Sequence, residues 1–205
     1  MPAEPLGLAA AWLAEAIRRK DQPNPNAMVL ATSAAGRPAA RIVLCKEIDA
    51  ASGLVRFVSN YDSRKGRELA ENPRAALLFH WDHLHRQVRI EGIAVKADAA
   101  DSDGYFASRH RDSQLGAHAS AQSRPIASTA ALRAQLDTVR ARFPDGTAVP
   151  RPANWGGYVM LVDTVELWVE GASRLHDRAQ WTRELAVSSS AAPVAGVWSS
   201  TRLQP

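Results

Sequence analysis

The spacing of apolar residues predicts one amphipathic helix followed by short strands. Leu8, Trp12 and Ala16 recur at helical spacing, so residues 8–19 are expected to form a helix that packs one face on a core. The polar, proline-containing stretch 21–26 ends it. Turn-forming residues separate the next three β-prone runs, as in an antiparallel meander. These runs are 27–32, 40–46 and 54–59.

Helices and strands both occur in the rest of the pattern. Residues 63–71 have the composition of a short helix, and two further strands are expected around a turn at 82–86. Those strands are 75–81 and 87–97. Three helices are expected at 99–108, 113–121 and 128–143, and strands at 156–163, 165–170 and 197–202. The small, polar run 187–194 indicates a mobile loop.

The order of these elements limits the fold class. The strands follow one another rather than alternating with helices, which argues against a doubly wound nucleotide-binding fold. We therefore expect a mainly β chain with flanking helices (α+β) and antiparallel strands. No GxGxxG, GxxxxGK[ST], HExxH or GxSxG motif is present, so four familiar chemistries lack their usual signature.

Composition changes this picture only slightly. The 205 residues, 46% hydrophobic and 22% charged, fit one ordinary globular domain or two small ones. The single cysteine, Cys45, excludes an internal disulfide, a CxxC pair and a thiolate zinc site. No apolar run approaches the roughly 18 residues of a membrane span, and the N-terminus lacks a signal-peptide pattern, so a cytoplasmic protein without membrane contact is expected.

The charge permits anionic partners without identifying one. The formal net charge is +4, too small a value to demonstrate nucleic-acid binding, and aromatic residues make up only 6% of the chain. We expect no nucleic-acid partner. The position of the cations is more informative than their number.

Ser63, Arg64 and Lys65 open the helix expected at 63–71. A helix N-terminus carries a positive partial charge, which disfavours cations in its first turn unless an anion binds there. A phosphate could accept the free backbone N–H groups, the hydroxyl and both cations together. The alternative is a solvated basic helix start.

A second polar cluster lies between two expected helices. Tyr105 and Arg109 are four residues apart on one helix face, and Ser113 is expected to open the next helix. Hydroxyl, guanidinium and helix dipole could converge there on a second phosphate. A polar turn with surface arginines explains the same residues.

Other charged residues carry weaker signals. Alternation places Arg41 and Lys46 on opposite faces of their strand, and Cys45 is expected to be a buried small hydrophobe. In an extended segment Arg174 and His176 would share a face with Arg178 and could orient an anionic aromatic substrate, although a local ion-pair patch is the commoner explanation of such a dense group of charges. Three histidines, His80, His83 and His85, straddle an expected turn without a nearby Glu or Cys, so no metal site is expected.

The ordered set of segments resembles the pyridoxamine 5′-phosphate oxidase family, FMN enzymes with a split β-barrel fold that work as homodimers. The resemblance runs from Trp12 to the C-terminus. Its markers are Asn26-Ala27-Met28, Arg41 to Lys46, Ser63-Arg64-Lys65, Arg86-Gln87-Val88, Tyr105 to Gln114, Gln122-Ser123, Trp155-Gly156-Gly157 and Arg174 to Arg178.

The resemblance implies one FMN-binding split-barrel domain over residues 1–205. Its parts would be an N-terminal helix at 8–19, the main barrel strands at 27–97, a helical segment at 99–143 and C-terminal strands at 155–205. The FMN contacts would be Arg41, Ile42, Val43, Leu44, Cys45, Lys46, Val58, Ser59, Arg64, Lys65, Gln87, Gln122, Ser123, Trp155 and Arg178. The substrate contacts would be Lys46, Tyr105, Arg109, Ser113, Arg174 and His176.

The resemblance also implies an activity. Pyridoxamine and/or pyridoxine 5′-phosphate would be oxidised to pyridoxal 5′-phosphate, with O2 as the electron acceptor and H2O2 as a product. Arg174 and His176 would be the catalytic residues that hold the substrate ring against the flavin, at the subunit interface of a homodimer. Two alternatives stay open: a phenazine-biosynthesis-type flavin oxidase on the same fold, and a noncatalytic protein that binds FMN or pyridoxal phosphate.

Overall fold

A computed structural model of the chain describes residues 1–186 and 194–205. The loop predicted at 187–194 lies outside these residues, except for Val194, which begins β9. Among the described residues, no helix has both the length and the apolar character needed to cross a membrane.

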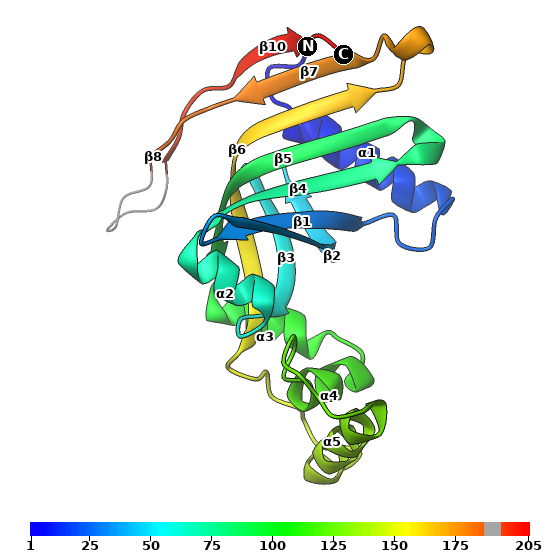
Figure 1. The fold of residues 1–205 in the computed structure, drawn as a ribbon, viewed down its shortest axis with the longest axis vertical. Helices are drawn as coiled ribbons and strands as arrows, with labels where there is room; N and C mark the ends of the chain where they lie inside the picture. The colour runs from blue at the N-terminus through cyan, green and yellow to red at the C-terminus, as the bar shows by residue number, and fades with distance from the viewer. Residues whose placement is uncertain (187–193) are drawn as a thin grey trace.

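Six antiparallel strands close into a barrel, in the order β6-β3-β2-β1-β4-β5 and back to β6. Beyond β6 the sheet continues through β7 and β10, and β8 pairs with β9 separately. The predicted antiparallel fold with flanking helices is therefore confirmed (Figure 1). The strands are β1 (Ala27–Ala34), β2 (Arg37–Asp49), β3 (Leu54–Asn60), β4 (Arg74–Trp81), β5 (Arg86–Lys96), β6 (Trp155–Val169), β7 (Asp177–Thr182), β8 (Leu185–Ala186), β9 (Val194–Ala195) and β10 (Ser199–Leu203).

The barrel closes where β5 pairs with β6. The register shifts between Glu91 and Gly92, which bends the strand pair. A Cβ atom at Gly92 would lie 2.0 Å from the carbonyl oxygen of Leu161, so only glycine fits at this bulge. Large side chains such as Phe57, Phe79 and Ile90 are fully buried inside.

Five α-helices flank the barrel: α1 (Leu6–Arg19), α2 (Arg64–Glu71), α3 (Ala99–Ala107), α4 (Arg111–Ala119) and α5 (Thr129–Arg142). Helix α1 packs on the main core through its buried stripe, which includes Leu6, Trp12 and Leu13. Helices α3 to α5 gather at the lower end of the molecule in Figure 1, over a second, smaller core of Phe106, Leu115, Val149 and Trp155.

Several predicted boundaries change in the structure. The expected strands 156–163 and 165–170 form the single strand β6, because its first half pairs with β3, its second half pairs with β7, and β5 runs along both. Strand β7 and the short 3-10 turn η2 (Ala172–Arg174) were not predicted. Helix α5 buries no residue completely: Leu136, Val139 and Phe143 pack on the smaller core, whereas Leu132 is exposed.

Candidate functional site

A groove runs between the outer face of β2 and helices α2 and α4. It consists of three adjoining hollows of about 290, 460 and 300 Å³, a size typical of small-molecule sites. The first hollow shares Ile42 and Lys65 with the second, and Asn60, Arg109, Gln122 and Trp155 with the third. Of the predicted site residues, the groove is lined by Arg41, Ile42, Val43, Leu44, Lys46, Val58, Ser59, Arg64, Lys65, Tyr105, Arg109, Ser113, Gln122, Ser123 and Trp155.

The N-terminus of α2 forms one end of the groove. Ser63 is fully buried, and its hydroxyl accepts from the Gly66 N–H at 3.2 Å and donates to the Asn60 carbonyl at 2.7 Å. Gly66 is required because a Cβ atom there would lie 2.0 Å from the Tyr61 carbonyl oxygen. Ser63 is therefore the N-cap rather than the first helical residue.

Lys65 points from this helix start towards the loop between α4 and α5. Its ammonium donates to Gln122 Oε1 at 2.7 Å and to Ser63 Oγ at 3.3 Å. Burial lowers the pKa of Lys65, and the charge of Arg41 lowers it further. Ser123, next along the loop, has a left-handed backbone with φ of 68°, which is uncommon outside glycine.

Arg41 and Arg64 reach the groove from different elements. Arg41 lies on β2 on the face opposite Lys46, as predicted, and Arg64 is the first residue of α2. Both guanidinium groups are paired with Glu68, at 2.6 Å and 2.7 Å. This buried partner holds both arginines at the helix start whether or not an anion binds there.

Tyr105, Arg109 and Lys46 come together at the other end of the groove. The rings of Tyr105 and Trp155 are nearly parallel, with centroids 6.2 Å apart, and the Arg109 guanidinium lies 4.6 Å from the Trp155 ring. The Lys46 ammonium lies 5.3 Å from the Tyr105 ring. The predicted cluster therefore forms, although Arg109 lies beyond the end of α3 rather than on it.

Arg109 has an unused donor. Its Nη1 atom is buried and, among the described residues, makes no hydrogen bond. Burial lowers the pKa of Arg109. An arginine side chain in a protein is nevertheless effectively always protonated at neutral pH. A buried cationic nitrogen without an acceptor is costly, so an anionic ligand fits this position.

Ser113 lines the same hollow as Arg109 but does not open α4. The helix begins at Arg111, and the Ser113 N–H already donates to the His110 carbonyl at 2.9 Å. The expectation that a free helix N-terminus contributes through Ser113 is therefore wrong. The exposed hydroxyl of Ser113 stays available to a ligand.

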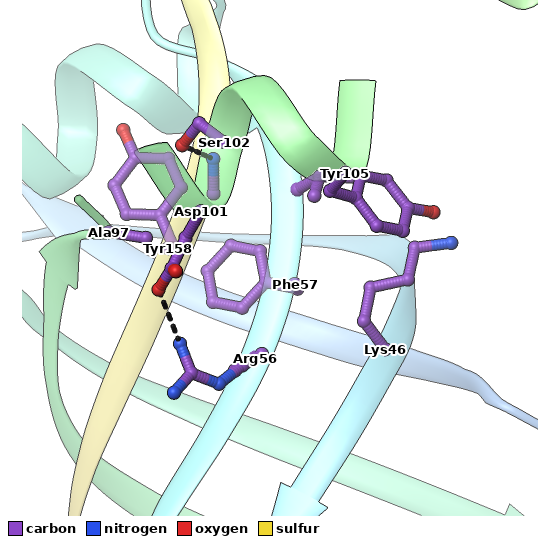
Figure 2. A pocket seen from close by; sticks show the side chains of 10 residues that line it. Lys46, Arg56, Phe57, Ala97, Asp101, Ser102, Tyr105 and Tyr158 are labelled. Atoms are coloured by element: carbon purple, nitrogen blue, oxygen red, sulfur yellow. Dashed lines mark hydrogen bonds and ion pairs between the residues drawn. The ribbon is translucent and has the colours of Figure 1, made fainter. Parts of the chain in front are cut away.

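A smaller apolar pocket of about 80 Å³ adjoins this end of the groove. Figure 2 shows Lys46 and Tyr105 on one side of it and Tyr158 on the other. Arg56 and Asp101 pair at its rim at 3.4 Å. Burial raises the pKa of Tyr158 to about 12, so its hydroxyl stays protonated.

The backbone of β2 between Arg41 and Lys46 forms the floor of the groove. Ile42 and Leu44 are exposed on this face, whereas Val43 and Cys45 point into the core. Burial raises the pKa of the Cys45 thiol to about 12, which agrees with the predicted buried hydrophobe. Although its side chain points into the core, Val43 is still among the residues that line the groove, whereas Cys45 is not.

Four predicted residues lie elsewhere: Gln87, Arg174, His176 and Arg178. Gln87 lies on β5, Arg174 ends η2, His176 directly precedes β7, and Arg178 is near the start of β7. The η2 turn lies at the end of the molecule opposite α4 and α5 in Figure 1. None of them lines the groove. Within one chain, the structure thus forms two separate groups of predicted site residues.

The predicted shared face of Arg174, His176 and Arg178 is wrong, because the segment is not extended. Ser173 and Arg174 have left-handed backbones, with φ of 56° and 66°, inside η2. The Gly171 N–H donates to His176 Nδ1 at 3.2 Å, so neutral His176 carries its proton on Nε2.

Trp168 is a site candidate that the sequence reasoning missed. It lies between Gln87 and Arg178 across three paired strands, and its ring centroid is 4.6 Å from that of His176. In the sequence it is simply a large aromatic residue near the end of an expected strand. Strand alternation alone cannot distinguish that from a core position.

The histidines considered for a metal lie beside separate acidic side chains. His83 lies 3.5 Å from Asp21, and His85 is paired with Glu170. Among residues 1–186 and 194–205, no group of three His, Cys, Asp or Glu side chains could hold a metal ion.

Comparison with known proteins identifies the family. Residues 13–143 match the family model described as pyridoxamine 5′-phosphate oxidase, and residues 155–205 match the pyridoxine 5′-phosphate oxidase C-terminal dimerisation region. A pyridoxine/pyridoxamine 5′-phosphate oxidase of Gluconobacter oxydans is 46% identical, over 100% of this chain and 96% of the relative. Another, from Burkholderia lata, is 50% identical over 95% of this chain and 86% of the relative.

Solved structures agree on the fold. PhzG from Burkholderia lata, in complex with tetrahydrophenazine-1-carboxylic acid, superposes with a TM-score of 0.86 at 33% identity, covering 100% of this chain and 94% of that one. An FMN-binding protein of Nostoc punctiforme, related to pyridoxamine 5′-phosphate oxidase, gives a TM-score of 0.74 at 17% identity, with 100% of both chains covered. With the groove, the barrel and both family models in agreement, the chain belongs to the pyridoxamine 5′-phosphate oxidase family and is an oxidase.

Proposed function

We propose that this protein oxidises pyridoxamine and/or pyridoxine 5′-phosphate to pyridoxal 5′-phosphate, using FMN, with O2 as electron acceptor and H2O2 as product. Relatives that share 46–50% identity over nearly the whole chain carry the name of this activity. The substrate carries one phosphate and the cofactor another, so the reaction requires two anion sites close together.

One observation carries the proposal: two groups of cations lie at the two ends of one groove. Arg41, Arg64 and Lys65 surround the start of α2, and Lys46 and Arg109 lie beside Tyr105. Each group presents several N–H donors, the chemistry that binds phosphate most strongly.

The residues at the α2 end fit the phosphate of FMN. Backbone N–H groups at a helix N-terminus, two guanidinium groups and an ammonium form a donor set that an anion satisfies. The backbone of Ile42 to Leu44 and the loop residues Gln122 and Ser123 would line the rest of the cofactor. FMN, when bound, would supply the two-electron acceptor that O2 reoxidises.

The residues at the Arg109 end would bind the substrate phosphate. Arg109 would direct its buried, unpartnered Nη1 at the ester, and the Lys46 ammonium, the Tyr105 hydroxyl and the Ser113 hydroxyl would surround it. Fixing the phosphate in this way orients the rest of the substrate along the groove. Orientation of this kind can supply several kcal/mol of the activation barrier.

We propose a homodimer in which the second group of residues completes the site of the partner subunit. Gln87, Trp168, His176 and Arg178 cluster together but do not line the groove of their own chain. Residues 155–205, which include most of this cluster, match a dimerisation region. His176, with its proton on Nε2, would donate to the substrate, and Arg174 would join it.

The test is an absorption spectrum of the purified protein loaded with FMN. Anaerobic addition of pyridoxamine 5′-phosphate should bleach the flavin band, and air should restore it with release of pyridoxal 5′-phosphate and H2O2. Tight flavin binding without bleaching would instead support the noncatalytic alternative.

A phenazine-type oxidase is the second candidate, because the PhzG structure covers the whole chain with a TM-score of 0.86. PhzG binds a larger aromatic acid that lacks a phosphate. This candidate predicts poor use of phosphorylated vitamers and bleaching by a reduced phenazine carboxylate. A strict requirement for the substrate phosphate would exclude it.

A further inference from the structure

Glu68 is a buried carboxylate at the base of the cationic end of the groove. It lies on α2, is 8% exposed, and contacts both arginines that line this hollow. Burying a charged carboxylate costs free energy unless it is paired and hydrogen-bonded.

Three donors from three elements converge on this carboxylate. Oε2 accepts from the Thr32 hydroxyl at 2.6 Å and from Arg41 Nη2 at 2.6 Å, and Oε1 accepts from Arg64 Nε at 2.7 Å. Burial alone would raise the pKa of Glu68, but these hydrogen bonds bring it below its ordinary value. The side chain is therefore charged at neutral pH and ties β1 and β2 to α2.

Glu68 occupies only part of the Arg64 guanidinium, whereas both terminal nitrogens of Arg41 already donate to Leu30, Thr32 or Glu68. In the described chain, Nη1 and Nη2 of Arg64 make no hydrogen bond, because only Nε is held by Glu68. The two terminal nitrogens form the fork that matches two oxygens of a phosphate. A side chain that is 63% exposed would otherwise sample many rotamers, so the bond to Nε limits its freedom.

The charges at this end of the groove also balance. Arg41, Arg64 and Lys65 are three cations, and Glu68 is one anion, which leaves two positive charges in excess. A phosphomonoester carries about 1.5 to 2 negative charges at neutral pH. Without Glu68, the positive charges of the three cations would repel one another. Burial and the charge of Arg41 lower the pKa of Lys65, and the negative charge of Glu68 partly offsets both effects.

We propose that Glu68 is a positioning residue for the cofactor phosphate: it holds Arg41 and Arg64 in place for the phosphomonoester of FMN and matches the charge of the site to a dianion. This inference rests on the proposed function, because it takes FMN as the occupant. It adds a residue that does not itself touch the ligand.

The experiment compares two flavins that differ only in the phosphate. The full-length protein, freed of flavin by dialysis, is titrated with FMN and with riboflavin, and binding is measured by quenching of flavin fluorescence. For Glu68→Gln we expect a loss of FMN affinity of about tenfold, which is about 1.4 kcal/mol, and unchanged riboflavin affinity. Glutamine keeps the size of the side chain but has only one oxygen to accept for two arginines.

Glu71→Gln is the matched control, since it makes the same chemical change on the same helix. Its carboxylate is exposed, and its Oε1 accepts from the Ala35 N–H, away from the groove arginines. The affinities for both flavins should match those of the unaltered protein. In the Arg64→Ala background, adding Glu68→Gln should cost clearly less than tenfold, because one of its two targets is gone.

The outcomes separate the inference from the proposed function. Equal loss of FMN and riboflavin affinity in Glu68→Gln, or unchanged FMN affinity, would overturn the positioning role. If Glu68→Gln does not fold, Glu68→Asp takes its place. Aspartate keeps the negative charge but is shorter by one methylene group, so we expect a smaller loss of FMN affinity and again no change in riboflavin affinity. An unaltered protein that binds neither flavin would refute the proposed function itself.

Discussion

Arg109 shows how a single side chain can indicate a ligand. Its guanidinium stacks 4.6 Å from the Trp155 ring, and its Nη1 is buried without an acceptor in the described chain. A purely structural arginine at this depth would pair with a carboxylate or a carbonyl, as Arg111 does with the carbonyls of Phe143 and Thr147.

Arg109→Ala and Arg64→Ala should separate the two phosphate sites. Loss of Arg109 should raise the KM for pyridoxamine 5′-phosphate by about 10-fold to 150-fold, since a hydrogen bond to a charged group contributes about 1.5–3 kcal/mol. FMN should stay bound. Arg64→Ala should mainly weaken FMN, as measured by flavin retention after gel filtration. Equal flavin loss in both variants would show that the two ends of the groove are assigned wrongly.

At the scale of elements, helix α2 depends on a cap that is more deeply placed than usual. Ser63 is fully buried and links the Gly66 N–H to the Asn60 carbonyl, so it fixes both the helix start and the preceding loop. Ser128, the serine N-cap of α5, is exposed, and its side chain accepts from the Ala131 N–H at 3.0 Å.

Ser63→Ala should therefore destabilise the protein more than Ser128→Ala. We expect the free energy of unfolding to fall by about 1–3 kcal/mol for Ser63→Ala, because the buried Asn60 carbonyl also loses the hydroxyl and keeps only the backbone N–H as a donor. For Ser128→Ala we expect a fall of about 0.5–1 kcal/mol. Urea denaturation followed by circular dichroism measures both. A larger effect at Ser128 would contradict this view of α2.

At the scale of the whole molecule, the predicted site residues form two groups in one chain. The groove holds one group. The other lies with Trp168 in a cluster in which Gln87, Trp168 and Arg178 are on β5, β6 and β7, and His176 directly precedes β7. A twofold dimer brings the same two surfaces together twice, so each groove can be completed by the cluster of the other subunit.

Mixed dimers test this arrangement. Assayed at a substrate concentration near the KM of the unaltered protein, Arg109→Ala and His176→Ala should each show little activity alone. When the two are coexpressed with different tags and purified as a heterodimer, one of the two sites contains no substitution, so about half the activity of the unaltered dimer should return. A heterodimer as inactive as its parents would mean that both residues serve the same subunit's site.

The sequence by itself determined the family, the antiparallel strands β1 to β5 and most of the residues that line the groove. These depend on local signals: alternation along β1 to β5, the capped start of α2, and ordered motifs such as Ser63-Arg64-Lys65. The residues that make up each signal lie close together in the sequence, so each signal can be recognised without knowledge of the fold.

Only the tertiary structure decided which charges meet. Glu68 accepts hydrogen bonds from Thr32 on β1 and Arg41 on β2, which are far from it in the sequence. Trp168 on β6 lies opposite Gln87 on β5 and Arg178 on β7 only because these strands pair. Likewise, the left-handed backbone of Arg174 removed the extended face expected for residues 174–178. These contacts join residues that are distant in the chain. The sequence contains both partners of each contact, but only the folded barrel shows which partners meet.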